Sequence, residues 1–468
     1  MSENILFLTG KLAEKSLHKV LAGMQTEGRS DFSYRVVQIG VSVAALITPE
    51  LILRRLPDAG DADRMVLPGL CRGDLAPLAA RYGIPVERGP EDLKDLPQYF
   101  GRGGKAPDLT RHNVRIFAEI VEAPDLTVEA ILRRAETYRK QGADVIDLGC
   151  LPNTPFPHMP EAIAALKSAG FLVSVDSLDQ DDLLLAGRSG ADYLLSLSEK
   201  TLWIADEVPA TPVLIPASPG NLPSLYRAID AMRKKGRAFI ADPILDPIPF
   251  GLAASIVRYH RLRKRYPDVQ IMMGVGNLTE LTDADTTGIN AVLFGIIAEL
   301  GINAVLATSV SPHAAHAVAE ADAARRIMYA AMEDKRLPRD YSAALLGLHD
   351  RRPFPYTDEE IAELAASVKD PSFRIQISES GLHVYNREGH YRDTDPFRLY
   401  PHLKVEDDAS HAFYLGVELA RAQIAWQLNK RYRQDEELEW GCCSRKKDDA
   451  DKVEHRKASL KGKRAGKE

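Results

Sequence analysis

Short apolar runs alternate with longer segments of helical periodicity between residues 113 and 330. Such alternation is typical of strands that are each followed by a helix and that pair in parallel. Eight consecutive units of this kind predict a (β/α)8 barrel, and a doubly wound open sheet is the alternative. The predicted strands are 114–120, 144–148, 172–175, 193–197, 213–215, 238–240, 271–274 and 304–308, with helical patterns at 128–141, 160–170, 223–235 and 287–300.

The segments on either side of residues 113–330 have different patterns. Residues 1–108 alternate apolar strands at 5–9, 34–39 and 64–67 with helical segments, which predicts a small α/β domain. Residues 331–443 contain turn signals at Ser380-Gly381 and Glu388-Gly389 and an apolar helical pattern at 411–428, which predict a C-terminal α+β domain. Residues 444–468 are almost without apolar side chains, so we expect a disordered charged tail.

Composition excludes several functional classes. The chain has 468 residues and a net charge of -6, so it lacks the basic character of a nucleic-acid-binding protein. We find no apolar run long enough to cross a membrane and no secretory signal, and we expect a cytoplasmic protein. Its four cysteines form no CxxC pair, so we expect neither a disulfide framework nor a bound metal.

Three aspartates stand at the carboxyl ends of predicted strands. Asp147 and Asp176 end or follow the strands at 144–148 and 172–175, and Asp242 follows the strand at 238–240. In a parallel barrel this end of the strands carries the active site, so these side chains predict a small-molecule site. Each aspartate also has a structural interpretation, since Asp176 could cap the next helix and Asp242-Pro243 could initiate a turn.

The order of four motifs, GADVIDLGC, VSVDS, ADPILDP and GVGN, resembles that of the pterin-binding barrels. These are the dihydropteroate synthases and the methyltransferases that use methylated tetrahydrofolate or tetrahydropterin. The flanking segments are similar to those of dihydropteroate synthase-like proteins of organisms that use tetrahydromethanopterin. The resemblance implies that this chain binds a reduced pterin, tetrahydromethanopterin or a relative, as substrate or ligand.

The resemblance also assigns roles to individual residues. It implies that Asp242 accepts the amine and ring N–H of the pterin, because one carboxylate can accept two adjacent donors. Asp176 would contact the other ring, and Asp147 and Asn277 would complete the polar groups around it. Asp176 and Asn277 are the catalytic candidates. Asn277 could instead hold its own glycine-rich loop.

The sequence departs from the synthase pattern where that pattern places cations. No lysine follows the seventh predicted strand and no arginine the eighth, and Val121-Glu122 stand where an asparagine is expected after the first. Departing diphosphate needs positive charge, so other residues would have to supply it. The candidates for contacting this anion or a second substrate are Arg72, Asn153 and His313.

Three functions remain open from the sequence. The first is a synthase that joins a dihydropterin methyl diphosphate to a ribosylated arylamine in tetrahydromethanopterin biosynthesis. The second is a methyltransferase that passes a methyl group from a tetrahydropterin to a corrinoid protein, for which the GVGN asparagine, Asn277, is the better match. The third is a non-catalytic pterin-binding subunit. By analogy with pterin-binding barrels, the protein could form a homodimer.

Overall fold

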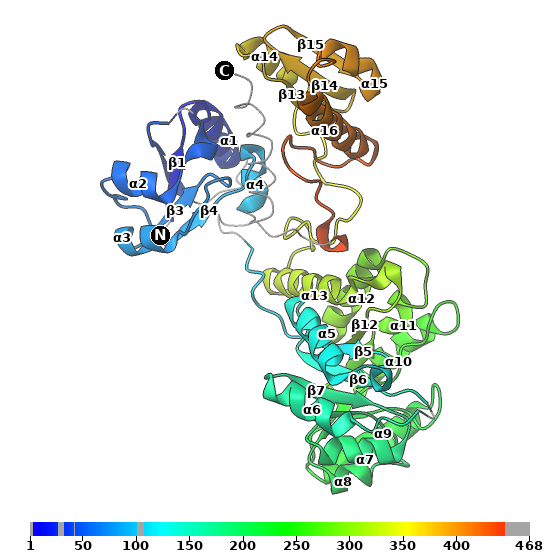
Figure 1. Cartoon of the computed structure of the whole chain (residues 1–468). Coiled ribbons are helices and arrows are strands. Elements are labelled where there is room, and N and C mark those ends of the chain that lie inside the picture. The colour runs from blue at the N-terminus through cyan, green and yellow to red at the C-terminus, as the bar shows by residue number, and fades with distance from the viewer. Residues whose placement is uncertain (1–2, 27–31, 42, 101–106, 153, 445–468) are drawn as a thin grey trace. The chain divides into compact units, whose positions relative to one another are not determined.

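The computed structural model describes residues 3–26, 32–41, 43–100, 107–152 and 154–444 (Figure 1). The chain forms two compact units. The first comprises Met1–Arg111 with Glu333–Ser342, and the second comprises His112–Met332 with Ala343–Glu468. Of the tail expected at 444–468, all but Ser444 lies outside the described residues.

The first unit contains a parallel four-stranded sheet in the order β2-β1-β3-β4. Apolar side chains of β1 alternate between its two faces, with Leu6 and Leu8 in one core cluster and Ile5 and Phe7 in the other. This alternation buries both faces, as expected for a parallel sheet covered by helices. The main elements are β1 Asn4–Thr9, α1 Glu14–Thr26, β2 Ser33–Gln38, α2 Pro49–Arg55, β3 Arg64–Leu67, α3 Ala76–Tyr82, β4 Val86–Arg88 and α4 Leu96–Tyr99.

The second unit contains eight parallel strands in the order β10-β9-β8-β7-β6-β5-β12-β11. A parallel bridge between Ala241 and Ile271 joins the two ends of this sheet, so the predicted barrel is confirmed and the open sheet is wrong. The strands are β5 Arg115–Ile120, β6 Val145–Gly149, β7 Leu172–Asp176, β8 Tyr193–Leu197, β9 Thr211–Leu214, β10 Ile240–Ala241, β11 Met272–Gly274 and β12 Ala304–Thr308. The main helices are α5 Val128–Lys140, α6 Met159–Ser168, α7 Gln180–Arg188, α9 Leu222–Lys234, α10 Leu252–Arg265, α12 Thr286–Leu300 and α13 Ala317–Asp334.

Alternation along the strands divides the barrel core into two layers. On β5, Ile116 and Ala118 pack toward the helices, whereas Phe117 belongs to the cluster inside the barrel. Phe117 meets Tyr193 of β8 there, with ring centroids 5.0 Å apart. Because side chains alternate along a strand, the next inward position on β5 after Phe117 is Glu119.

A buried arginine fastens the start of the barrel to its last helix. The side chain of Arg325 on α13 is 1% exposed and donates to the carbonyl oxygens of Val114 and Gly142. It also forms ion pairs with Asp144 and Asp322. One guanidinium group thus binds two carbonyl oxygens and two carboxylates at once, which the single ammonium group of a lysine could not reproduce.

The C-terminal part of the second unit is an antiparallel three-stranded sheet with helices. The turn signals at Ser380-Gly381 and Glu388-Gly389 each lie where two antiparallel strands join, and the apolar pattern at 411–428 falls almost wholly in a long helix. No helix in the described ranges combines the length and apolar character that a membrane crossing requires. The elements are α14 Asp358–Ser367, β13 Arg374–Ser378, β14 Gly381–Asn386, β15 Gly389–Asp393, α15 Pro396–Leu399 and α16 Ala409–Gln427.

Candidate functional site

Three carboxylates from adjacent strands meet at the carboxyl end of the barrel. Glu119 of β5 and Asp147 of β6 are partners in the strand register, and Asp176 is the last residue of β7. One oxygen from each side chain lies within 4.8 Å of the other two. Asp147 is fully buried, and Glu119 and Asp176 are partly buried. Two of the three strand-end aspartates expected from the sequence, Asp147 and Asp176, therefore converge, together with a glutamate that was not expected.

The hydrogen bonds to this acid cluster (Glu119, Asp147 and Asp176) come from neutral hydroxyl groups. Ser174 donates to Oδ1 of Asp147, and Thr308 of β12 donates to Oε2 of Glu119 at 3.1 Å. The second oxygen of Asp147, Oδ2, is buried and has no hydrogen-bond partner among the described residues. Burying a carboxylate oxygen without a donor costs free energy, and a bound cation or a proton at the cluster would remove that cost.

Burial raises the pKa of each acid in the cluster, and nearby negative charges raise it further. For Asp147, burial is the larger cause, followed by the charges of Asp176 and Glu119. For Asp176, burial, Glu119 and Asp242 raise the pKa from 3.8 to about 7. Burial likewise raises the pKa of Glu119. A carboxyl group that titrates near neutral pH is suited to accept or donate a proton during catalysis.

Asp242 follows the two-residue strand β10 and is held from two sides. Its Oδ1 accepts hydrogen bonds from the hydroxyl of Tyr259 and the amide of Ile244, both at 2.7 Å. Burial raises its pKa to about 6, although these hydrogen bonds and the charge of Arg258 act in the opposite direction. The turn interpretation of Asp242-Pro243 is thus correct locally, but the same carboxylate also lies close enough to Asp176 to influence its titration.

Arg258 fixes the segment that follows Asp242. It donates to the carbonyl oxygen of Ile244 at 2.8 Å and pairs with Asp246 at 2.7 Å. Ile244 has a φ of 66°, a left-handed conformation that is unusual for a β-branched residue. The arginine therefore holds a strained loop in place beside the candidate ligand site.

Asn277 lies in the short helix α11 Gly276–Thr279, and its Nδ2 donates to the carbonyl oxygen of Leu245 at 2.8 Å. It thus fastens the loop after β11 to the loop after β10, rather than holding only its own glycine-rich loop. Asn277 is therefore beside the segment that carries Asp242.

The alternative interpretation of Asp176 as a helix cap is wrong, because Asp179 caps α7.

Of the three anion candidates, Arg72 and His313 belong to different units. Arg72 is exposed and belongs to the first unit, whereas the acid cluster belongs to the second. Asn153 lies outside the described residues. His313 is exposed, and its Nε2 lies 3.1 Å from the carbonyl oxygen of Thr279. The amides of Val310 and Ser311, in the loop after β12, donate to the carboxylate of Glu280 at 2.7 and 2.9 Å.

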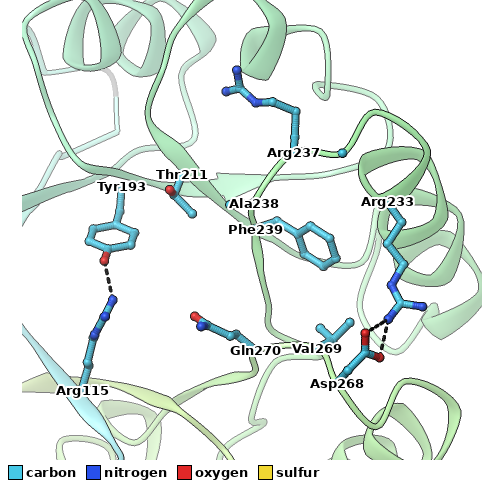
Figure 2. Close-up of a pocket in the computed structure, with 11 residues that line it drawn as sticks. Arg115, Tyr193, Thr211, Arg233, Arg237, Ala238, Phe239, Asp268, Val269 and Gln270 are labelled. Carbon is cyan, nitrogen blue, oxygen red and sulfur yellow. Dashed lines mark hydrogen bonds and ion pairs between the residues drawn. The ribbon is translucent and has the colours of Figure 1, made fainter.

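A cavity of about 530 Å³ lies at the opposite, amino-terminal end of the barrel strands (Figure 2). Arg115 extends to the hydroxyl of Tyr193 at 2.7 Å, and Arg233 pairs with Asp268. No residue of the acid cluster lines this cavity. Because barrel enzymes place their chemistry at the carboxyl ends of the strands, we assign the candidate site to the acid cluster and not to this cavity.

Comparison with known proteins gives partial likenesses. Residues 3–91 match a family of unknown function, DUF6513. The chain is 27% identical to the uncharacterized protein MJ0107 of Methanocaldococcus jannaschii, over 93% of this chain and 98% of that protein. The dihydropteroate synthase of Vibrio fischeri is 18% identical and covers 48% of this chain and 94% of its own, with a TM-score of 0.38. That of Thermus thermophilus is 19% identical and covers 48% and 95%, with a TM-score of 0.37.

Two residues of the candidate site, Glu119 and Tyr259, were not recognised in the sequence. Glu119 is separated by a single residue from the Val121-Glu122 pair that occupies the expected asparagine position, and its alternation with Phe117 would have identified it as inward-facing. Tyr259 lies within a helix with no local signal that it would reach Asp242.

Proposed function

We propose that the carboxyl end of this barrel binds a reduced pterin and that the protein is a dihydropteroate synthase-like transferase. The observation that carries this proposal is that Asp147 and Asp176 meet at the barrel mouth with Asp242 close enough to raise the pKa of Asp176, while Asn277 is bonded to the loop that follows Asp242. A pterin has an amine and a ring N–H side by side, and one carboxylate can accept both. Asp242 suits this role because Tyr259 and a backbone amide already fix its orientation.

The reaction we favour joins a dihydropterin methyl diphosphate to a ribosylated arylamine in tetrahydromethanopterin biosynthesis. The arylamine nitrogen forms a bond to the pterin methyl carbon while the C–O bond to diphosphate breaks. The nitrogen then loses a proton, for which Asp176, with its pKa of about 7, is a suitable acceptor near neutral pH. Asn277, which connects the loop after β11 to the loop after β10, would help to orient the pterin ring.

One observation favours a second function. The loop after β11 carries Asn277 and Glu280, and Glu280 accepts the amides of the loop after β12, in the two places where a synthase would have cations for diphosphate. A methyltransferase needs no diphosphate clamp, and an amide beside the ring suffices to orient the pterin. We therefore keep methyl transfer from a tetrahydropterin to a separate corrinoid protein as the alternative, and a non-catalytic pterin-binding subunit as the third possibility.

The test of pterin binding is calorimetry of the purified protein, in EDTA, against dihydropterin, tetrahydrofolate and tetrahydromethanopterin. Asp242→Asn should weaken binding by at least about 30-fold, since losing a paired buried carboxylate costs about 2–5 kcal/mol. Asp268→Asn, at the other end of the barrel, is the matched control and should bind normally. Equal affinity of wild type and Asp242→Asn would contradict the proposed site.

Two activity assays then distinguish the reactions. Release of diphosphate from the activated pterin in the presence of an arylamine supports the synthase. Methyl exchange between methyl-tetrahydropterin and free cob(I)alamin supports the methyltransferase. Tight pterin binding without either reaction supports the non-catalytic subunit.

A further inference from the structure

The acid cluster has more negative charge than a pterin alone would satisfy. Glu119, Asp147 and Asp176 bring three carboxylates together, and Asp242 adds a fourth charge nearby. Across the described part of the chain, no lysine, arginine or histidine forms an ion pair with any of the three clustered side chains. Close carboxylates without a counter-charge repel one another strongly in a partly buried site.

A second observation comes from Asp147. This side chain is fully buried, yet its Oδ2 accepts no hydrogen bond from the described residues, while Oδ1 accepts only the hydroxyl of Ser174. Buried polar atoms in folded proteins nearly always have a partner. An oxygen without a donor beside two further carboxylates is a position for a proton or for a bound cation.

The spacing and the chemistry of the ligands narrow the identity of that species. Oxygen atoms on opposite sides of Mg²⁺ are about 4.2 Å apart, and on opposite sides of Ca²⁺ up to about 5 Å apart, from the usual metal–oxygen distances. The three oxygens lie within 4.8 Å of one another, so they are close enough to contact Ca²⁺, and Mg²⁺ fits where their separations are no more than about 4.2 Å. An all-oxygen set without histidine or cysteine favours hard cations over zinc.

We propose that Glu119, Asp147 and Asp176 bind one hard divalent cation, such as Mg²⁺ or Mn²⁺. Three protein ligands leave about half of an octahedral shell for water or for oxygen atoms of a bound substrate. The site differs from the sequence-based expectation of no metal because that expectation did not include Glu119. A bound cation would hold Asp176 ionised, so in the cation-bound protein the arylamine proton would pass to water rather than to Asp176. The cation site does not depend on the identity of the organic ligand, so it can be tested without any pterin.

The backbone gives this cluster a fixed frame. The three residues lie on neighbouring strands whose register pairs Glu119 with Asp147 and Gly149 with Asp176. A Cβ atom on Gly149 would lie only 2.7 Å from Oε1 of Glu119. The absence of a side chain at this position therefore leaves the glutamate room to reach the other two acids.

The experiment is titration of metal-free, full-length protein with Mn²⁺, followed by electron paramagnetic resonance and calorimetry, and then competition with Mg²⁺. We expect one Mn²⁺ per chain that Mg²⁺ displaces. Glu119→Gln and Asp147→Asn should each weaken Mn²⁺ binding by at least about 10–100-fold, the loss seen even when an outer partner of a metal ligand is removed. Asp268→Asn is the control and should bind like wild type.

The two variants protect the test against a folding defect, because Glu119 is only partly buried and its change keeps the side-chain shape. Circular dichroism confirms that each variant is folded. Absence of specific Mn²⁺ binding to the wild type would overturn the proposal, as would binding that both folded variants retain. In those cases the cluster is neutralised by protons. The pterin titrations in EDTA are unaffected by this outcome, so the two proposals fail separately.

Discussion

The hydrogen bond from Tyr259 to Asp242 allows a sharp test of how the site works. Tyr259 is fully buried, and its hydroxyl donates to Oδ1 of Asp242 at 2.7 Å. A hydrogen bond to a charged group contributes about 1.5–3 kcal/mol. Replacing Tyr259 with phenylalanine removes this donor and leaves the ring in place. The ionised form of Asp242 is destabilised, and its pKa should rise.

The size of the effect follows from the pKa of Asp242, which is about 6 in the wild type. A loss of about 1.5–3 kcal/mol corresponds to about one to two pH units, which moves the pKa to about 7–8. At pH 7 about 90% of wild-type sites would be ionised, against about 10–50% in the variant. If pterin binds to the carboxylate form, Tyr259→Phe weakens binding by about two- to tenfold at pH 7, and the loss disappears at pH 9.

The assay is pterin fluorescence titration from pH 5 to pH 9 in EDTA, on wild type and variant in parallel. Protonation of the pterin itself affects both proteins equally, so the ratio of their affinities isolates the protein. Tyr266→Phe is the matched control, because its hydroxyl donates to Asp230 at 2.9 Å in the same barrel. The reasoning is refuted if the pH midpoint of Tyr259→Phe equals that of wild type, or if its weaker binding persists unchanged at pH 9.

Three further outcomes are expected. Because the pKa of Asp242 is raised, the folded protein binds its proton more tightly than the unfolded chain does, and the wild type loses stability as the pH rises from 3.8 to about 6. The Asp242→Asn variant cannot titrate at this position, so its free energy of unfolding in urea should exceed that of the wild type by up to about 3 kcal/mol above pH 7 but not at pH 4. Arg325→Met should lower the free energy of unfolding by about 3–5 kcal/mol, because it leaves buried acceptors unpaired. Arg326→Met is the control: the Arg326 side chain is 26% exposed, so the loss should be less than about 1 kcal/mol, and equal losses in the two variants would contradict this. Gly149→Ala should change stability by less than about 1 kcal/mol, since the Glu119 side chain can turn aside, but should weaken Mn²⁺ binding at least about tenfold; unchanged binding would show that Glu119 is not a ligand.

The barrel could be predicted because its strands are short apolar runs that end where the pattern changes. The expected bounds at 193–197 and 304–308 match β8 and β12. The strand expected at 238–240 was shifted, because only Ile240 and Ala241 pair with β9. A strand of two residues has almost no periodicity of its own, and its position is set by pairing with its neighbour.

The candidate site was predicted only in part, for a physical reason. Asp147, Asp176 and Asp242 were identified because each interrupts or ends an apolar run, which is a local signal. The partners that determine their chemistry, Glu119 and Tyr259, come from other parts of the chain. Which donors and charges surround a carboxylate depends on barrel closure, and no short stretch of sequence carries that information.

The barrel sheet is closed between β10 and the start of β11, and this join has a consequence for binding. Beside β10 the sheet is linked by the bridge between Ala241 and Ile271, and farther along by the hydrogen bond from Asn277 to Leu245. A ligand that contacted both Asp242 and Asn277 would connect the two sides of this join. By thermodynamic reciprocity, the factor by which ligand favours the closed join equals the factor by which the closed join strengthens ligand binding. Ligand should therefore slow amide hydrogen exchange at Ala241, whose N–H donates to the carbonyl oxygen of Gln270.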